Sequence, residues 1–413
     1  MEHNISKDDE RRRKQREKAY KKTCDEYLSE IKGLRERSDY LTEFEYFLNL
    51  SQKPLQSAEL KNRVNKDLIA LFCIQAPLEL FDALDLHAIK LTGGSHAAQR
   101  LSVSSLPVLM CPMLKSYIGS LGFEEEGASA YAATILPTTC DWVVKFPEIV
   151  KGKIANLHYL ELPHVKQTEK SQSRWLEEIF DLKIFLENLT GRKLQRQNLI
   201  SSQKKYMEIW GSFQELIACK RKNILADIWF TVIANTFMLD KVDVWHEKLK
   251  LLLDRLQTAV IQENPYKVFL AGSPIIFPNL KILQLIEQAG MSVCADDLCS
   301  SERIFPGATL YSDASVYGIL KALAERNHKA CICPTFTDND RRVNNILRLT
   351  SENNIKGVIF HILKGCHPYD IESITIEEKL KNQGIKFLKL ETDYVKEDSQ
   401  NILTRLEAFK QTL

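Results

Sequence analysis

Ten cysteines are the residues of this sequence best suited to carry chemistry, and several of them stand where apolar segments end. Cys140 closes the run ATILPTTC and is followed at once by Asp141. Cys366 closes GVIFHILKGC, Cys299 follows MSVCADD, and Cys111 stands beside a proline in LPVLMCPMLKS. If the apolar runs are parallel strands, their ends meet at one edge of a sheet, where α/β proteins bind their ligands. These cysteines are therefore candidates for a common site.

Two roles are open to such cysteines. A cysteine can be a small apolar residue that is simply buried, which we expect for Cys24, Cys219 and Cys294 inside helical or strand segments. A thiolate at a strand end faces a crevice, where it is unfavourable unless a metal binds it. The strand-end cysteines come from separate segments rather than from C-x-x-C pairs, and no histidine pairs accompany them. Soft thiolates of this kind favour an iron-sulfur cluster over a zinc site.

The elements that must position these cysteines follow an alternation of strand and helix patterns. Over residues 65–169, short apolar runs alternate with helical stretches, which is typical of a parallel α/β sheet. The alternation returns over residues 265–413, where YKVFLAG, MSVCADD, IKGVIFHIL and IKFLKLETD are predicted strands separated by helices. Strands joined by crossover helices predict a doubly wound sheet of flavodoxin-like type. Residues 170–264 carry apolar positions at three- and four-residue spacing and are predicted to be helical.

Composition limits the function classes. A chain of 413 residues, 44% of them hydrophobic, can form two or three domains, since one core rarely grows beyond roughly 250–300 residues. Counts of 56 Lys+Arg and 54 Asp+Glu nearly balance, so no global field indicates nucleic acid or a membrane as partner. The longest apolar stretch contains Asp227 and is shorter than the ~20 residues that span a bilayer. The charged N-terminus lacks the apolar segment of a secretory signal, so we expect a cytoplasmic protein with reduced cysteines.

Residues 1–64 are predicted to form a charged helical arm. The segment is dense in Lys, Arg and Glu, and apolar positions such as Tyr27, Ile31 and Leu34 have helical spacing. We interpret it as a solvated arm or docking helix. Nucleic-acid binding by the basic run at residues 11–14 is the weaker interpretation, because acidic residues are interleaved with it.

Six segments, in order along the chain, resemble the iron-sulfur subunits of the 2-hydroxyacyl-CoA dehydratase and benzoyl-CoA reductase superfamily. They are LPVLMCPMLKSYIG, LPTTCDWVVKFPE, VFLAGSPIIFPNLKILQLIEQAG, DDLCSSERIF, GVIFHILKGCHPYDIE and KLETDYVKEDSQNILTRLEAF. The resemblance covers about residues 70–413 and leaves out the arm. It implies two flavodoxin-like domains with a cluster in their cleft, ligated by Cys111, Cys140 and Cys366. It also implies anaerobic, low-potential chemistry driven by a separate ATP-hydrolysing iron-sulfur activator protein, and this chain has no GxxxxGK[ST] loop of its own.

Two branches of the superfamily fit the sequence. Dehydratase and benzoyl-CoA reductase subunits resembling this chain carry one [4Fe-4S] cubane with an iron open to an acyl-CoA substrate, whereas double-cubane proteins join two cubanes through a sulfide and need about six thiolates. Further cysteines are similar to the second branch: Cys73 in LFCIQAPLEL, Cys299 in DDLCSS, and Cys331 and Cys333 in ACICPTFTDNDRR. The resemblance therefore favours a double-cubane reductase of a small molecule. The alternative is a single-cubane reductase subunit or dehydratase-like lyase.

Residues beside these cysteines have two interpretations each. Asp141 either caps the following helix or lies next to the ligands and adjusts the properties of the cluster without binding it. His367 either donates a hydrogen bond to a cluster sulfur or is an ordinary loop histidine. Glu372 is either an acid or base beside a substrate or only a first-turn helix residue. Two positions depart from the resemblance: Trp142 begins the run WVV where a glycine-lysine run usually follows TTCD, and Ser273 stands where double-cubane relatives often have cysteine.

Two further function classes remain open. One is a cluster-free α/β protein whose cleft binds a nucleotide or an acyl-CoA and whose cysteines only pack. The other is a non-catalytic scaffold or electron-transfer subunit that docks through the charged arm. The resemblance also implies a homodimer, or a heterodimer with a related subunit.

Overall fold

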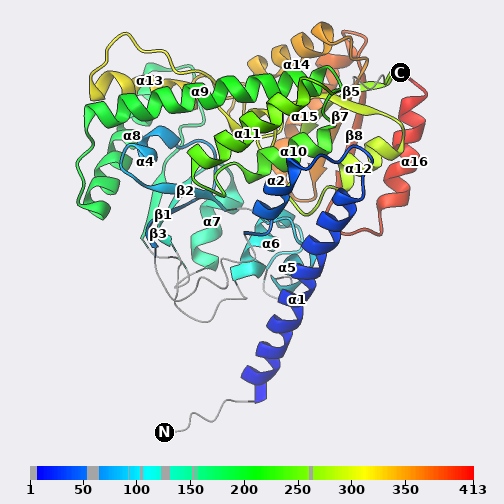
Figure 1. Ribbon diagram of the computed structural model, residues 1–413, viewed down its shortest axis with the longest axis horizontal. Helices are drawn as coiled ribbons and strands as arrows, with labels where there is room; N and C mark the ends of the chain where they lie inside the picture. The colour runs from blue at the N-terminus through cyan, green and yellow to red at the C-terminus, as the bar shows by residue number, and fades with distance from the viewer. Residues whose placement is uncertain are drawn as a thin grey trace.

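Two parallel four-stranded sheets form the scaffold of the protein (Figure 1). The computed structural model describes residues 7–53, 65–91, 93–102, 106–121, 131–150, 154, 156–259 and 264–413. Every strand pairing within the two sheets is parallel, and helices connect the strands. The α/β class predicted from the alternation of strand and helix patterns is therefore confirmed.

The first sheet lies in the N-terminal half of the chain. From edge to edge its strands are β2 (His87–Lys90), β1 (Asn65–Leu71), β3 (Tyr131–Pro137) and β4 (Leu157–Leu160). Its helices are α4 (Leu78–Asp82), α5 (His96–Ser102), α6 (Pro112–Leu121) and α7 (Asp141–Ile149). Strand β3 is buried from its second residue to its end, as expected for an apolar strand covered on both faces.

The second sheet repeats the strand order of the first. From edge to edge it contains β6 (Ser292–Asp296), β5 (Lys267–Gly272), β7 (Gly357–Leu363) and β8 (Lys386–Thr392). Its helical elements are α12 (Lys281–Gln288), η2 (Glu302–Ile304), α13 (Val316–His328), α14 (Asp340–Glu352), α15 (His367–Lys381) and α16 (Ser399–Lys410). In each sheet the chain starts inside, adds one strand on one side and then two on the other, so the C-terminal ends of all strands lie at the same edge.

Four helices connect the two sheets. They are α8 (Glu169–Thr190), α9 (Arg196–Arg221), α10 (Asp227–Thr236) and α11 (Val242–Leu256). Helix α9 packs against α4 on one side and against β6 and α13 on the other, so it contacts both halves of the chain (Figure 1). Helix α10 contains much of the longest apolar stretch of the sequence. Nearly all of its side chains are buried, which explains why most of them are apolar. No described helix is both long and apolar enough to cross a membrane.

The N-terminal helix α1 (Lys7–Arg35) belongs to the protein body only in part. Its first half projects away from the rest of the molecule (Figure 1), whereas Tyr27, Ile31 and Leu34 in its second half are buried. The short helix α2 (Phe44–Leu50) buries Phe44, Phe47, Leu48 and Leu50 in the core, where the ring of Phe44 stacks on Trp229 at 4.1 Å. The arm is therefore not solvated along its length, and its predicted end at residue 64 lies outside the described residues.

Candidate metal centre

Cys111, Cys140 and Cys366, the first cysteine group, each stand at the start of a helix. The carbonyl oxygen of each accepts the first helical hydrogen bond, from Lys115 N at 3.0 Å, Val144 N at 2.9 Å and Asp370 N at 3.1 Å respectively. Each cysteine is thus an N-cap residue, and backbone N–H groups of the first turn point at its thiol. Three helix N-termini, each carrying a partial positive charge, therefore face the three thiols and favour negative charge on them.

The loops of this group come from both sheets and meet closely. Cys366 interacts with both Cys111 and Cys140, so the three thiols are neighbours. The indole Nε1 of Trp142 donates to the carbonyl of Gly365 at 3.0 Å. Gly365 has a φ of +80°, and a Cβ there would lie 1.7 Å from the carbonyl oxygen of Leu109, so only glycine fits this crossing. The backbones of the loops before Cys111 and Cys366 are therefore packed directly against each other.

Burial dominates the acid-base behaviour of the first group. It raises the pKa of the Cys111 thiol to about 11, and it raises the pKa values of Cys140 and Cys366 as well. Thiols of this kind stay protonated at neutral pH, so they are poor nucleophiles and lose their protons only when a metal replaces them.

Cys73, Cys299, Cys331 and Cys333 form the second cysteine group. Cys73 follows β1, Cys299 follows β6, and the other two follow α13. Cys73 interacts with Cys299 and Cys331, and Cys333 interacts with Cys331 and Cys73. Burial raises the pKa of Cys73 to about 12 and also raises that of Cys333, with neighbouring thiols adding to the effect. The four half-buried cysteines are therefore neighbours in one region of the fold.

Cationic side chains surround the second group, and the sequence patterns did not predict them. Lys166 Nζ donates to the carbonyl of Cys331 at 2.6 Å, and Lys90 Nζ donates to that of Cys299 at 3.3 Å. The guanidinium of Arg303 faces the thiols of Cys299 and Cys333. These cations favour negative charge in the second group, as the helix N-termini do in the first.

The two groups are adjacent. The hydroxyl of Thr335, two residues after the last cysteine of the second group, donates to the carbonyl of Thr139, next to Cys140. On another side, Arg303 Nη2 donates to the hydroxyl of Tyr369 at 3.2 Å, and the backbone N–H of Tyr369 points at the thiol of Cys366. The seven cysteines predicted to bind the cofactor, of which all but Cys331 were predicted as metal ligands, are thus brought to one region of the fold.

The donor set fits a cluster better than a single ion. Among the residues that the structure describes, no three His, Cys, Asp or Glu side chains lie close enough together to hold one metal ion. A mononuclear zinc site needs that arrangement, with every ligand within about 2.3 Å of the ion. A cubane instead offers each thiolate its own iron, so its ligands stand apart around a larger body. Groups of three and four thiols, of which Cys111 is buried and the other six are half-buried, match this requirement and the preference of iron-sulfur clusters for soft ligands.

The remaining predicted site residues have mixed outcomes. Asp141 is the first residue of α7 and no side chain caps that helix, so the predicted cap is wrong because Cys140 occupies the N-cap position. The exposed ring of His367 lies 6.2 Å from that of Trp142, and its hydrogen bond to a cluster sulfur stays a prediction. Glu372 lies beyond the first turn of α15 and binds Asn339 and Arg342, so the first-turn interpretation is wrong.

Ser273 belongs to the surroundings of the first group. Its Oγ accepts from Leu363 N at 3.0 Å and is hydrogen-bonded to the thiol of Cys366. A hydroxyl therefore stands beside the three thiols at the end of β5. The cysteines expected to pack lie elsewhere: Cys24 in α1, Cys219 in α9 and Cys294 in β6. All ten cysteines are free of disulfides.

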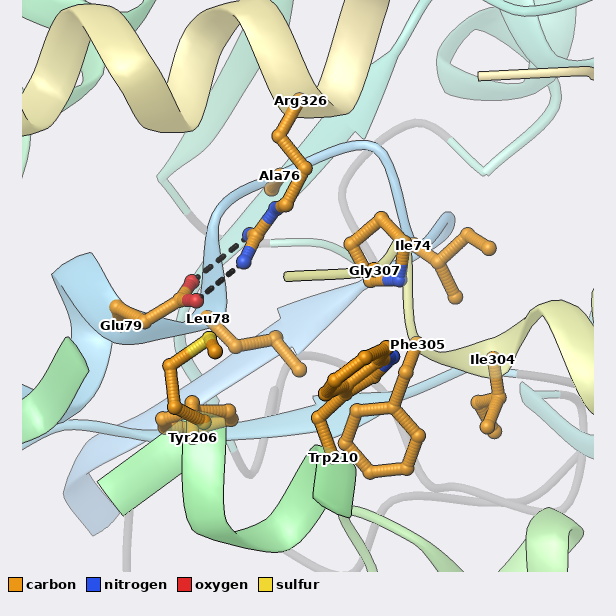
Figure 2. A pocket seen from close by; sticks show the side chains of 12 residues that line it. Ile74, Ala76, Leu78, Glu79, Tyr206, Trp210, Ile304, Phe305, Gly307 and Arg326 are labelled. Carbon is orange, nitrogen blue, oxygen red and sulfur yellow. Dashed lines mark hydrogen bonds and ion pairs between the residues drawn. The ribbon is translucent and has the colours of Figure 1, made fainter. Parts of the chain in front are cut away.

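A small cavity lies next to the second group (Figure 2). It is lined by Ile74, the neighbour of Cys73, and by the rings of Trp210 and Phe305. At one side Arg326 Nη2 binds Glu79 Oε2 at 3.0 Å, and both side chains are buried. Its volume of about 20 Å³ holds roughly one water molecule, so this cavity takes neither a nucleotide nor an acyl-CoA.

Comparison with known proteins gives matches over most of the chain. A family model described as 2-hydroxyglutaryl-CoA dehydratase, D-component, matches residues 73–413. The putative dehydratase subunit YjiM of Escherichia coli is 25% identical over 361 residues, covering 84% of this chain and 91% of that protein. The (R)-phenyllactyl-CoA dehydratase beta subunit of Clostridium sporogenes is 21% identical over 332 residues, covering 78% and 85%. The (R)-2-hydroxyglutaryl-CoA dehydratase subunit beta of Acidaminococcus fermentans is 24% identical over 294 residues, covering 68% and 75%.

Proposed function

We propose that this chain, which belongs to the 2-hydroxyglutaryl-CoA dehydratase D-component family, is an iron-sulfur enzyme whose two cysteine groups hold a double-cubane cluster. The family resemblance expected from the sequence is thereby confirmed. The observation that carries the proposal is the gathering of seven cysteines from separate segments into adjacent groups of three and four. Six thiolates complete a double cubane, so one of the seven is in excess.

The proposed architecture is a pair of flavodoxin-like domains with the cluster between them. Two sheets of identical strand order support it, since β2-β1-β3-β4 and β6-β5-β7-β8 are the same arrangement. We assign residues 65–169 and 265–413 to the two domains, with the helical segment 170–264 joining them. The cysteine loops at the strand ends of both sheets then line the cleft, where doubly wound sheets bind their ligands.

The residues of the chain have definable tasks in this proposal. A bound double cubane would supply electrons at low potential to a small molecule. The helix N-termini at Cys111, Cys140 and Cys366 stabilise the negative charge of the first group. Lys166 and Arg303 do the same for the second. Cys111 is buried and the other six cysteines are half-buried, so the fold would limit the access of water to the thiolates.

A partner is part of the proposed activity. Two of the relatives are named beta subunits, which implies a further subunit in those enzymes. We extend this to a homodimer or a heterodimer with a related chain. Electrons would come from a separate ATP-hydrolysing iron-sulfur activator protein, and the reaction would be the low-potential reduction of a small molecule.

The second candidate function is a single-cubane subunit of an acyl-CoA dehydratase or benzoyl-CoA reductase. Ser273 favours it, because a hydroxyl and not a fourth thiol accompanies the three thiols of the first group. Three thiolates are what a cubane with one open iron requires. In this case the second group would remain thiols, and the first alone would act on a bound acyl-CoA.

Iron and sulfide analysis of the anaerobically purified chain, with Mössbauer and electron paramagnetic resonance spectra, distinguishes these functions. The double-cubane proposal expects about eight irons per chain, and the second candidate expects about four together with tight acyl-CoA binding. Cys140→Ser and Cys333→Ser should each deplete iron, whereas the matched variant Cys219→Ser in α9 should not. A colourless, iron-free wild type would refute both functions. A cluster-loaded chain without turnover in the presence of activator and ATP would indicate a scaffold or electron-transfer subunit.

A further inference from the structure

Asn339 stands at the N-cap of α14, yet its side chain does not cap that helix. Asparagine is a favoured N-cap residue because its side-chain oxygen accepts from the first turn. Here the amide Nδ2 points elsewhere: it donates to the carbonyl of Ile332 at 3.3 Å, to that of Cys333 at 3.1 Å and to Glu372 Oε1 at 2.6 Å. The side chain therefore fixes the backbone of the Cys331–Cys333 loop to helix α15.

The contact continues through buried charges. Glu372 also binds the guanidinium of Arg342, which in turn binds Asp297 through Nε–Oδ2 at 2.5 Å and Nη2–Oδ1 at 3.1 Å. The side chains of Arg342 and Asp297 are 0% exposed. Asp297 directly follows β6 and is two residues from Cys299.

Asp297, Arg342, Glu372 and Asn339 form a continuous chain of contacts, which we name the polar bridge. It connects the loop of Cys299 to the loop of Cys333, and both to α15, the helix that starts after Cys366. Buried ion pairs add little net stability, since desolvation offsets their attraction, but they select one geometry. Charge-assisted bidentate contacts of an arginine are especially directional. A bridge of this composition suits a task of positioning.

We propose that the polar bridge is the positioning element that sets the spacing of the second cysteine group relative to the first. The inference rests on the proposed double-cubane function, because it assigns a task in cluster binding to residues that are not ligands. Asn339 holds the carbonyl of Cys333 and is itself held by Glu372, Asp297 lies two residues before Cys299, and Arg342 joins the two halves. A substitution that breaks the polar bridge leaves every cysteine in the chain, but the thiols of the second group no longer have a fixed position relative to the first group.

The first test measures cluster loading. Asn339→Ala should reduce iron from about eight to about four per chain, with the spectrum of the first group retained. Asn344→Ala is the matched control, since Asn344 is an exposed asparagine of the same helix. Glu372→Gln keeps an acceptor for Asn339 and removes the charge that faces Arg342, so its iron content should lie between those of Asn339→Ala and wild type. Full iron in Asn339→Ala would overturn the inference.

The second test does not depend on a cluster. In the cluster-free full-length chain, iodoacetamide labelling rates of single cysteines can be followed by peptide mass spectrometry. Asn339→Ala should label Cys333 at least about tenfold faster than wild type, because the hydrogen bonds that hold its loop are lost. The labelling rate of Cys111 and the circular dichroism spectrum should not change. Equal labelling rates of Cys333 in wild type and Asn339→Ala would reject the positioning role, whatever the iron content of the wild type. A wild type with about four irons per chain would instead reject the proposed double-cubane function.

Discussion

Lys220 offers a direct test of how the fold supports the Cys299 loop. Its side chain is fully buried, and Nζ binds Asp227 Oδ1 at 2.5 Å, Glu302 Oε1 at 3.2 Å and the carboxylate of Asp296. The only other cation at these carboxylates among the described contacts is Arg221, which binds Glu302 at 2.9 Å. Lys220→Met therefore leaves Asp227 and Asp296 buried without a cation.

The magnitude follows from these contacts. At 2.5 Å and an effective dielectric constant of ~20, one such pair attracts by about 7 kcal/mol, and the desolvation of lysine offsets much of this. Removal of one partner from a buried pair typically costs about 3–5 kcal/mol of unfolding free energy, which we expect for Lys220→Met at pH 8. Lys222→Met, two residues away and exposed, should change it by less than about 0.5 kcal/mol.

The assay is urea unfolding of the reduced, cluster-free chain, followed by tryptophan fluorescence. The effect should extend to the site, because Asp296 accepts from Leu298 N at 2.9 Å and from Ser301 Oγ at 2.6 Å on either side of Cys299. Lys220→Met should therefore also speed iodoacetamide labelling of Cys299. If Lys220→Met and Lys222→Met unfold at the same urea concentration, the carboxylates are not held by Lys220 and the reasoning fails.

The other predictions concern pH and backbone fit. Burial raises the pKa of Asp227 from 3.8 to about 7, so the folded chain binds a proton that the unfolded chain releases. Asp227 should thus contribute unfolding free energy that grows as pH falls from about 8 toward 4, and Asp227→Asn should lose this contribution; parallel pH profiles for the two proteins would contradict this. Gly365→Ala should destabilise the chain by more than Gly384→Ala, since both glycines have positive φ but only Gly365 faces a carbonyl at 1.7 Å; equal urea midpoints would show that the crossing relaxes.

Much of the first cysteine group could be predicted from the sequence. The strands before Cys140 and Cys366 are uninterrupted apolar runs, and in a parallel sheet such runs must end at one edge. In the second group only Cys299 was a strand-end candidate from the residues alone. Cys73, Cys331 and Cys333 required the family resemblance, because their sequence surroundings do not differ in pattern from those of packing cysteines such as Cys294. Their convergence depends on how two sheets are placed together, which local periodicity does not encode.

The errors have local causes. We predicted Asp141 as the N-cap of α7 because aspartate is favoured at N-cap positions. The helix begins at Asp141 itself, so the N-cap is the residue before it, Cys140. The segment of α2 was included in a charged arm although its aromatic residues Phe44 and Phe47 are buried. The cations around the second group left no signal, since Lys166 meets Cys331 across 165 positions of sequence and a single lysine has no periodicity.

The two cysteine groups meet one electrostatic requirement by different parts of the fold. A cluster with thiolate ligands is anionic, and cysteines that are buried or half-buried leave part of that charge for the protein to compensate. The first group lies where three helices begin, so the backbone itself supplies the positive ends, and Lys115 of α6 is directed to the carbonyl of Val108. Among the described residues no α-helix begins directly after Cys299 or Cys331, and side-chain cations take that place. The backbone contribution is fixed once the strands and helices form, whereas the side-chain contribution must be held by packing and by the polar bridge. The second group is therefore the part of the site that substitution of residues other than cysteine can alter.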